Sequence, residues 1–184
     1  MIRILPALVI ADCCLYWVRR GMHRQRILWL THAFHHSIDQ LRWLSGSRTS
    51  VTHLLLYAAP QALFGYYVFQ FTPAEAGVAF SMGVVVNIWI HVNISVNLGP
   101  LNGLLFTPDY HRIHHGAGGL AGKNLGFILT VWDMIFGTYA DSRAIGDAFA
   151  LSAVSMRKRL VRLIIGCRGS VWLSVISYPS LYSF

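Results

Sequence analysis

Long apolar segments alternate with short basic stretches along this chain of 184 residues. The first apolar segment covers residues 2–18. Two longer ones cover residues 53–71 and 76–98, on either side of a short turn at residues 72–75. A helix needs about 20 predominantly apolar residues to cross a membrane. The pattern therefore predicts one N-terminal membrane helix followed by a transmembrane hairpin.

The remaining elements are shorter. We expect an amphipathic interfacial helix over residues 25–44, and a further helix after Thr107, where Pro108 suits the first turn. Residues 116–122 are rich in glycine and predict a loop, whereas residues 127–136 predict another interfacial helix. The expected fold class is all-α: an integral membrane helical protein in which one N-terminal membrane helix and a transmembrane hairpin carry a cytoplasmic, histidine-rich helical cap.

Composition and charge support this organisation. The chain is 55% hydrophobic and only 12% charged, which is too apolar for an ordinary soluble domain. Its net charge of +8 comes from residues that flank the apolar segments, as expected of cytoplasmic positions beside anionic headgroups rather than of a nucleic-acid-binding face. We expect residues 1–140 to form the membrane domain and residues 141–184 to be a tail of uncertain structure. The cysteines show no metal-type or disulfide spacing and are expected to be packing residues.

The candidate chemistry lies in two copies of an H-x-x-H-H pattern, at His32, His35 and His36 and again further along the chain at His111, His114 and His115. Positions i, i+3 and i+4 share one face of a helix, so we expect each triplet to direct three imidazoles at one point. Clustered imidazoles repel one another when protonated and are costly to bury without partners. A bound transition metal removes both problems, and imidazole suits zinc, copper, iron and nickel.

Further polar residues lie close to or within the apolar segments. His23 follows the first apolar segment, and His91 lies inside the last one, where an ionisable group is a functional candidate by default. Asp12 is expected to accept a hydrogen bond or to pair with an arginine, and His53 is expected to be interfacial rather than catalytic. Eight candidate ligands exceed the needs of one tetrahedral ion, so two metals are the simplest interpretation. A di-metal site beside a membrane suggests oxidation of a lipid, because attack on an unreactive C–H bond needs an oxidant that side chains cannot supply.

These residues resemble those of the sterol desaturase and fatty acid hydroxylase superfamily, with the bacterial members most similar. The resemblance covers residues 8–139. It is carried by Asp12 and Tyr16-Trp17-Val18, His23, Leu28-Trp29-x-x-His32-x-x-His35-His36-Ser37, His91-Val92-Asn93, Thr107-Pro108-Asp109-Tyr110-His111-Arg112-Ile113-His114-His115, Asn124, and Trp132-Asp133-x-x-Phe136-Gly137-Thr138.

The resemblance implies a membrane oxidoreductase in which two iron ions and dioxygen oxidise a lipid C–H bond by hydroxylation or desaturation. It implies an acyl, sterol or related lipid substrate, and a separate electron donor, either cytochrome b5 or a ferredoxin with its reductase. No catalytic residue is implied beyond the iron ligands, which by position would be His23, His32, His35, His36, His91, His111, His114 and His115.

One departure from the family pattern affects the expected site. The family's first histidine box is H-x-x-x-H, and here Arg19 stands at its first position, with His23 at the last. Arginine stays protonated and offers no lone pair to a metal. Two alternatives to the active enzyme therefore stay open: an inactive or truncated relative that binds lipid or a partner, and a histidine-rich zinc or copper protein.

Overall fold

The computed structural model describes residues 3–38, 40–116, 120 and 122–141. Within them the regular elements are helical, and the strand-like pairing is limited to one isolated bridge between Leu105 and Leu129. The all-α expectation is confirmed for this part of the chain, whereas the expected tail falls, apart from Asp141, outside the described residues. The elements are α1 (Ile4–Arg24), α2 (Arg26–His36), η1 (Ser45–Ser47), α3 (Val51–Ala62), η2 (Leu63–Val68), α4 (Pro73–His91), η3 (Gly99–Gly103), α5 (Pro108–His114) and α6 (Val131–Ile135).

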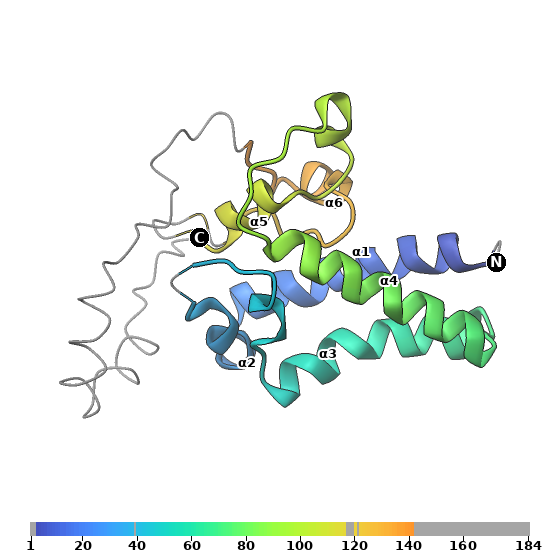
Figure 1. Cartoon of the computed structure of the whole chain (residues 1–184). Coiled ribbons are helices and arrows are strands. Elements are labelled where there is room, and N and C mark those ends of the chain that lie inside the picture. Colours follow the sequence, from blue (N-terminus) through green and yellow to red (C-terminus); the bar gives the residue numbers. More distant parts are fainter. Residues whose placement is uncertain (1–2, 39, 117–119, 121, 142–184) are drawn as a thin grey trace.

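α1, α3 with its continuation η2, and α4 lie lengthwise beside one another (Figure 1). The shorter helices α2, α5 and α6 lie toward one end of them (Figure 1). α1 contacts α2, α3 and α4, and α4 contacts α5. A small core joins α1 and α4 to the segments on either side of α5, through Leu15, Ile90, Phe106, Tyr110 and Phe127. The histidine-rich segments are therefore held against the ends of the long helices.

The predicted hairpin is present, with different boundaries. Its first arm is not one continuous α-helix, because α3 contains Pro60 and passes into the π-helical segment η2. α4 starts at a capping box in which the Thr72 hydroxyl accepts from the backbone N–H of Glu75 and the Glu75 carboxylate accepts from that of Thr72. Arg3 forms an ion pair with Glu75 at 3.1 Å and so ties the start of α1 to the tip of the hairpin.

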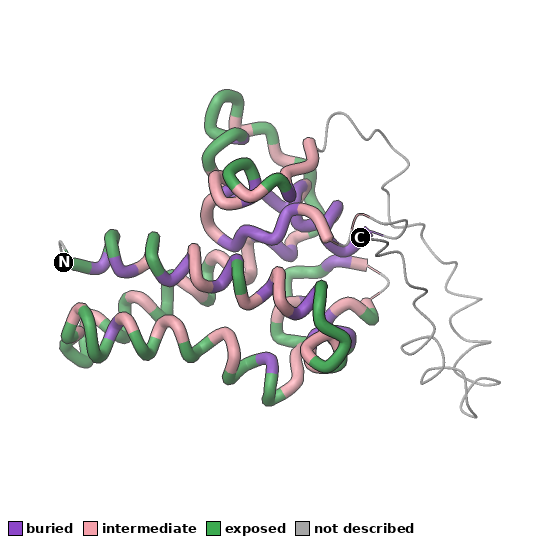
Figure 2. Tube along the Cα trace, turned by 180° about the vertical axis from the view of Figure 1, so that it is seen from behind, coloured by how far each residue is buried: buried purple, intermediate pink, exposed green. Residues whose placement is uncertain are grey.

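The hairpin is largely exposed. Among the described residues, α4 is the one helix long and apolar enough to cross a membrane, and little of it is buried by the rest of the chain. Figure 2 shows many buried positions along α1 and in the segments around α5 and α6, and mostly exposed positions along the hairpin. Large exposed apolar side chains include Leu54, Tyr67, Phe80 and Val85. An exposed apolar surface of this kind is typical of helices that face lipid.

Three predicted helices were too long. α2 ends at His36 rather than at residue 44, and the Ser45 hydroxyl accepts from the backbone N–H of Arg42 just before the short 3-10 helix η1. α4 ends at His91 rather than at residue 98. α6 begins only at Val131, because the preceding residues pair with the segment before α5 and with Asp12.

Candidate metal centre

Eight buried or half-buried histidines form two adjacent groups of four. The ligand atoms within each group all lie within 4.8 Å of one another. The groups touch, since the rings of His36 and His115 stack at 4.3 Å between centroids. We name the first set group one and the second set group two: His23, His32, His36 and His114 form group one, and His35, His91, His111 and His115 form group two.

Each triplet is divided between the groups, which differs from the expectation that each directs three imidazoles at one point. His32 and His36, at i and i+4, enter group one, whereas His35 enters group two. The second triplet does the reverse: His111 and His115 enter group two, and His114 enters group one. Around the helix axis, residue i+4 lies about 40° from residue i, whereas residue i+3 lies about 60° from it on the other side. The imidazole at i+3 is therefore directed away from the other two, toward the neighbouring group. His23 from α1 and His91 from α4 complete the two sets.

Backbone carbonyls fix the orientation of three of these rings. The Nδ1 atom of His91 lies 2.6 Å from the carbonyl oxygen of Asn87, that of His35 lies 3.3 Å from Arg48 O, and that of His114 lies 3.1 Å from Lys123 O. A carbonyl only accepts hydrogen bonds, so in each neutral ring Nδ1–H is the donor. Nε2 is then left with a lone pair, which is the arrangement that metal-binding histidines use.

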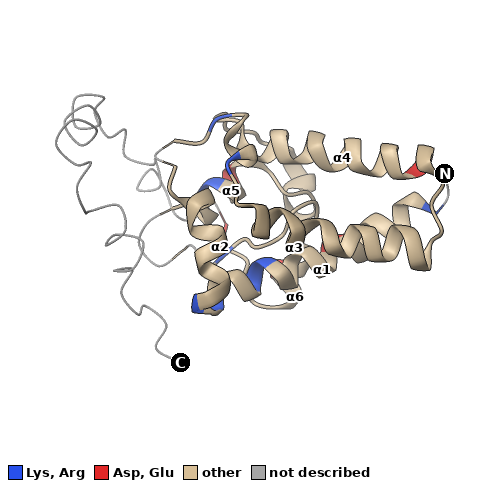
Figure 3. Cartoon of the chain, turned by 90° about the horizontal axis from the view of Figure 1, so that it is seen from below, with Lys and Arg blue, Asp and Glu red and all other residues tan. Residues whose placement is uncertain are grey.

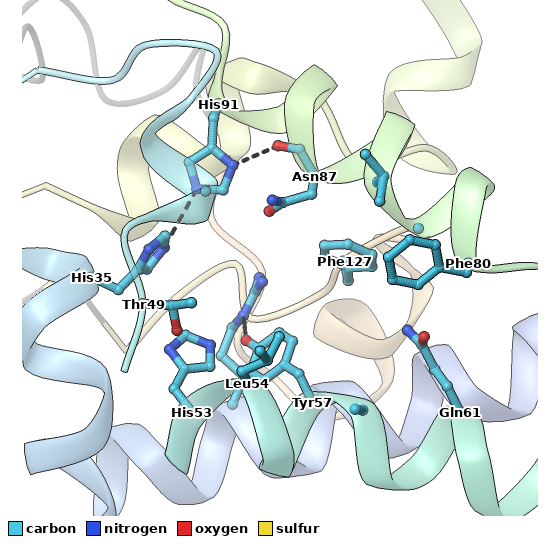
Figure 4. A pocket seen from close by; sticks show the side chains of 15 residues that line it. His35, Thr49, His53, Leu54, Tyr57, Gln61, Phe80, Asn87, His91 and Phe127 are labelled. Atoms are coloured by element: carbon cyan, nitrogen blue, oxygen red, sulfur yellow. Dashed lines mark hydrogen bonds between the residues drawn. The ribbon is translucent and has the colours of Figure 1, made fainter. Parts of the chain in front are cut away.

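The lone pairs of His35 and His91 consequently face each other, with their Nε2 atoms 3.4 Å apart (Figure 4). Two acceptors at this distance repel unless a cation lies between or beside them. Similar Nε2 to Nε2 distances recur within both groups: 2.9 Å for His91 and His111, and 3.1 Å for His36 and His114. The donor set therefore fits metal ions bound by imidazole nitrogen.

Several buried ring nitrogens without hydrogen-bond partners also indicate a metal site. Both ring nitrogens of His23 are buried without a hydrogen-bond partner, and so is Nδ1 of His111. Buried nitrogens are rarely left unsatisfied in a folded protein. Burial, together with the neighbouring imidazoles, also lowers the pKa of the triplet histidines well below its usual value, so these rings are neutral at physiological pH and able to bind a metal: His32, His35, His36, His111, His114 and His115.

Two residues that the sequence did not assign to the site support it from outside. His53 is buried, and its Nδ1 atom lies 3.3 Å from Nδ1 of His32, so it supports that ring without belonging to either group. Trp29 packs its ring 5.2 Å from that of His23 and 5.3 Å from that of His36. The W-x-x-H spacing places Trp29 one helical turn before His32, so the sequence could have predicted that Trp29 lies beside the histidines. Nothing in the sequence around His53 marks it as a neighbour of His32.

Arg19 lies close to both groups and belongs to neither. Its guanidinium donates from Nε to the Tyr57 hydroxyl at 2.7 Å and from Nη1 to the carbonyl oxygen of Gly126. The side chain is buried, with 3% exposure, and lies near the rings of Tyr57 and Phe127. Each group still has four imidazoles without a histidine at position 19.

A cavity of about 190 Å³ opens beside group two, between α1, α3 and α4. His35, His53 and His91 lie on one side of it, and Phe80 and Gln61 on the other (Figure 4). Most of its wall is apolar, formed by residues such as Leu54, Val84 and Phe127. The cavity thus joins an apolar space between membrane-type helices to the histidine cluster.

Charge is distributed unevenly over the long axis. Among the described residues, most Lys and Arg positions lie toward the end that carries α2 and α5, and Glu75 lies near the opposite end with Arg3 (Figure 3). The cytoplasmic position of the histidine end stays a prediction from the sequence.

Comparisons with known proteins identify the family. A family model described as fatty acid hydroxylase matches residues 4–138. Human alkylglycerol monooxygenase is 34% identical over 128 residues, which are 67% of this chain and 27% of that protein. The Danio rerio alkylglycerol monooxygenase is 35% identical over 133 residues, 70% of this chain and 28% of that protein. Ornithine lipid hydroxylase OlsE of Rhizobium tropici is 32% identical over 142 residues, 74% of this chain and 41% of that protein.

This chain thus matches less than half the length of these relatives. No solved structure matches it at a significant level. The resemblance inferred from the histidine boxes is confirmed: the chain belongs to the fatty acid hydroxylase family.

Proposed function

We propose that this chain is a membrane di-iron lipid hydroxylase that depends on dioxygen, with group one and group two each holding one iron. The observation that carries the proposal is the facing pair of Nε2 lone pairs on His35 and His91, both fixed by Nδ1–H donation to backbone carbonyls. When bound, the irons would supply the activation of dioxygen that side chains cannot provide. The eight residues that would hold them are His23, His32, His36, His114, His35, His91, His111 and His115.

The protein's own contribution is orientation. Asn87, Arg48 and Lys123 keep a proton on Nδ1 of their histidine partners and so keep each Nε2 free to bind. His53 holds the ring of His32 from behind. Because these supports are backbone carbonyls or a buried ring, the imidazoles need little rearrangement when they bind a metal ion.

The substrate class follows from the cavity. Leu54, Phe80 and Phe127 line an apolar space that reaches His35 and His91. A volume of about 190 Å³ holds part of an alkyl chain rather than a whole lipid, since pockets for drug-sized molecules occupy roughly 300–1,000 Å³. The protein would thus receive one segment of a lipid from the membrane, and the cavity wall would exclude water from the carbon atom that reacts.

The relatives favour hydroxylation over desaturation, because two of them are named for a monooxygenase and a hydroxylase reaction. Electrons would come from a separate carrier, a cytochrome b5 or a ferredoxin with its reductase, at the basic, cytoplasmic end. An inactive lipid-binding relative is the alternative, and it rests on Arg19 at the position of a family histidine.

Metal analysis with a turnover assay tests the proposal. Wild type and Arg19→His would be purified in detergent, and their iron, zinc and copper content per chain would be measured. We expect about two irons in both proteins, and reductant-dependent formation of a hydroxylated lipid. Iron only in Arg19→His would indicate an inactive relative, and retention of zinc or copper after growth with ample iron would contradict the proposal.

A further inference from the structure

Arg19 is a buried cation without a carboxylate partner. It is 3% exposed, and within the described part of the chain it forms no ion pair. Asp12 and Asp133 are near enough to interact with it through space, but backbone N–H groups occupy both carboxylates. A buried, unpaired guanidinium is destabilising unless its N–H groups find acceptors.

Only part of its hydrogen-bonding capacity is used. Of the five N–H groups of a guanidinium, Nε donates to Tyr57 and one on Nη1 donates to Gly126 O. Cζ of Arg19 also lies 5.7 Å from the ring centroid of Tyr57 and 5.8 Å from that of Phe127. Within the described residues the remaining three N–H groups, one on Nη1 and two on Nη2, have no protein acceptor.

Arg19 lines the same cavity as His35 and His91 of group two. The rest of the wall is mostly apolar, so an alkyl chain in the cavity would surround the guanidinium with hydrocarbon and remove water from it. A pure hydrocarbon segment would leave three N–H groups without acceptors, whereas an oxygen atom on the lipid would accept from one or two of them.

We propose that Arg19 is a recognition residue for an acceptor oxygen of the substrate, so that the chain binds lipid segments carrying an ether, hydroxyl or carboxylate oxygen beside the methylene groups in preference to plain hydrocarbon. This inference rests on the proposed function, because the cavity is taken as the substrate site. An oxygen held by Arg19 would fix which carbon faces His35 and His91. The position that the family uses for a ligand would thus serve here in substrate selection.

The test measures binding without turnover. Radiolabelled octadecane, methyl octadecyl ether and stearate would be bound to the purified protein in detergent, and the ratio of ether or stearate binding to octadecane binding would be determined. Partition into detergent is common to all variants and cancels when ratios are compared. The proteins are wild type, Arg19→Met, Arg19→Lys and, as a matched control, Arg26→Met, which makes the same change at an exposed position outside the cavity.

We expect wild type to prefer the oxygen-bearing chain by about 10-fold or more, as a hydrogen bond to a charged group provides. The ratio should fall to about one in Arg19→Met, take an intermediate value in Arg19→Lys, and stay at the wild-type value in Arg26→Met. Preference for stearate alone would identify the recognised group as an anion, and preference for both would show that an uncharged oxygen suffices; either supports the proposal. A wild-type ratio near one, or an unchanged ratio in folded Arg19→Met, would overturn it.

Two further measurements keep the result interpretable. If Arg19→Met fails to fold by circular dichroism and size exclusion, Tyr57→Phe replaces it, because it removes the hydroxyl that holds Nε and keeps the charge. The ratio should then fall several-fold, and an unchanged ratio would overturn the proposal. Iron content and hydroxylated product, measured in parallel, separate the two claims: oxidation with a ratio near one refutes oxygen recognition alone, and a high ratio without oxidation refutes only the enzyme.

Discussion

The Asp12 carboxylate in α1 accepts a hydrogen bond from the indole Nε1 of Trp132 at 2.9 Å, although 120 positions separate them in the sequence. The same carboxylate accepts from the backbone N–H groups of Ile128, at 2.9 Å, and Leu129, at 3.0 Å. Of the two roles expected for Asp12, hydrogen bonding is the one that the structure contains. This contact fastens the segment before α6 to the long helix and so places Gly126 and Phe127 beside Arg19.

Replacing Asp12 should therefore weaken the packing of residues 128–132 against α1. Asp12→Ala leaves three donors without their acceptor, and we expect it to destabilise the fold by about 3–5 kcal/mol, since hydrogen bonds to charged groups contribute about 1.5–3 kcal/mol each and do not add fully. Asp12→Asn should cost less, because one acceptor oxygen remains. Thermal unfolding in detergent measures both, with Cys13→Ala, a change of the half-buried neighbour, as the control. Equal unfolding temperatures for Asp12→Ala and Cys13→Ala would contradict this role.

His36 and His53 should differ in their effect on metal content. His36→Ala removes a member of group one, so bound iron should fall from about two to about one per chain. His53 belongs to neither group and supports His32, so His53→Ala should keep both ions but weaken the affinity of one by about 10–100-fold, the usual effect of losing an outer partner. Metal titration after chelation measures both. Loss of an ion in His53→Ala at saturating iron would show that His53 is a ligand.

Gly46 is needed for a close approach of η1 to α4. A Cβ at this position would overlap the side-chain amide of Asn87, whose backbone oxygen holds Nδ1 of His91. Gly46→Ala should push these segments apart, lower the unfolding temperature and weaken metal binding at group two. Gly77→Ala is the matched control, because a Cβ there meets nothing within 4 Å. In α4 alanine is the better helix former by about 1 kcal/mol, so the control should be neutral or stabilising.

Acid should destabilise the metal-free protein. Burial lowers the pKa of the triplet histidines well below the value of about 6.5 that they regain on unfolding: His32, His35, His36, His111, His114 and His115. Below that value the unfolded chain binds more protons than the folded one, so stability is fully present above pH of about 6.5 and is lost as the pH falls.

The unfolding temperature of chelator-treated protein, measured from pH 8 to pH 5, checks this direction. We expect a steady fall below pH of about 6.5. A constant or rising unfolding temperature over that range would show that the imidazoles are not buried in the neutral form.

The apolar pattern was sufficient to predict the two helical arms around residues 72–75, and histidine spacing was sufficient to predict that the triplets would cluster. His23 and His91 were added by their place beside or within the apolar segments and by the family resemblance. The pattern failed where a polar contact between distant segments shortens a helix: Asp12 accepts from the backbone of the residues before α6. Such contacts depend on the tertiary arrangement and leave no local signal.

The division of the triplets was also beyond the sequence. Helical spacing places His32, His35 and His36 on one broad face, but whether they meet at one point or two depends on what faces them. Here α5 and the ends of α1 and α4 provide two sets of partners, and this is known only once the helices are packed.

The two histidine groups join parts of the chain that are far apart. His36 and His114 are 78 positions apart, and His35 and His115 are 80 apart. An ion bound between such positions closes a long loop and restricts the unfolded chain much as a disulfide does, so its binding free energy becomes folding free energy. Iron supply in the cell would then set how many copies reach maturity, and iron starvation would lower the abundance of the protein as well as its turnover.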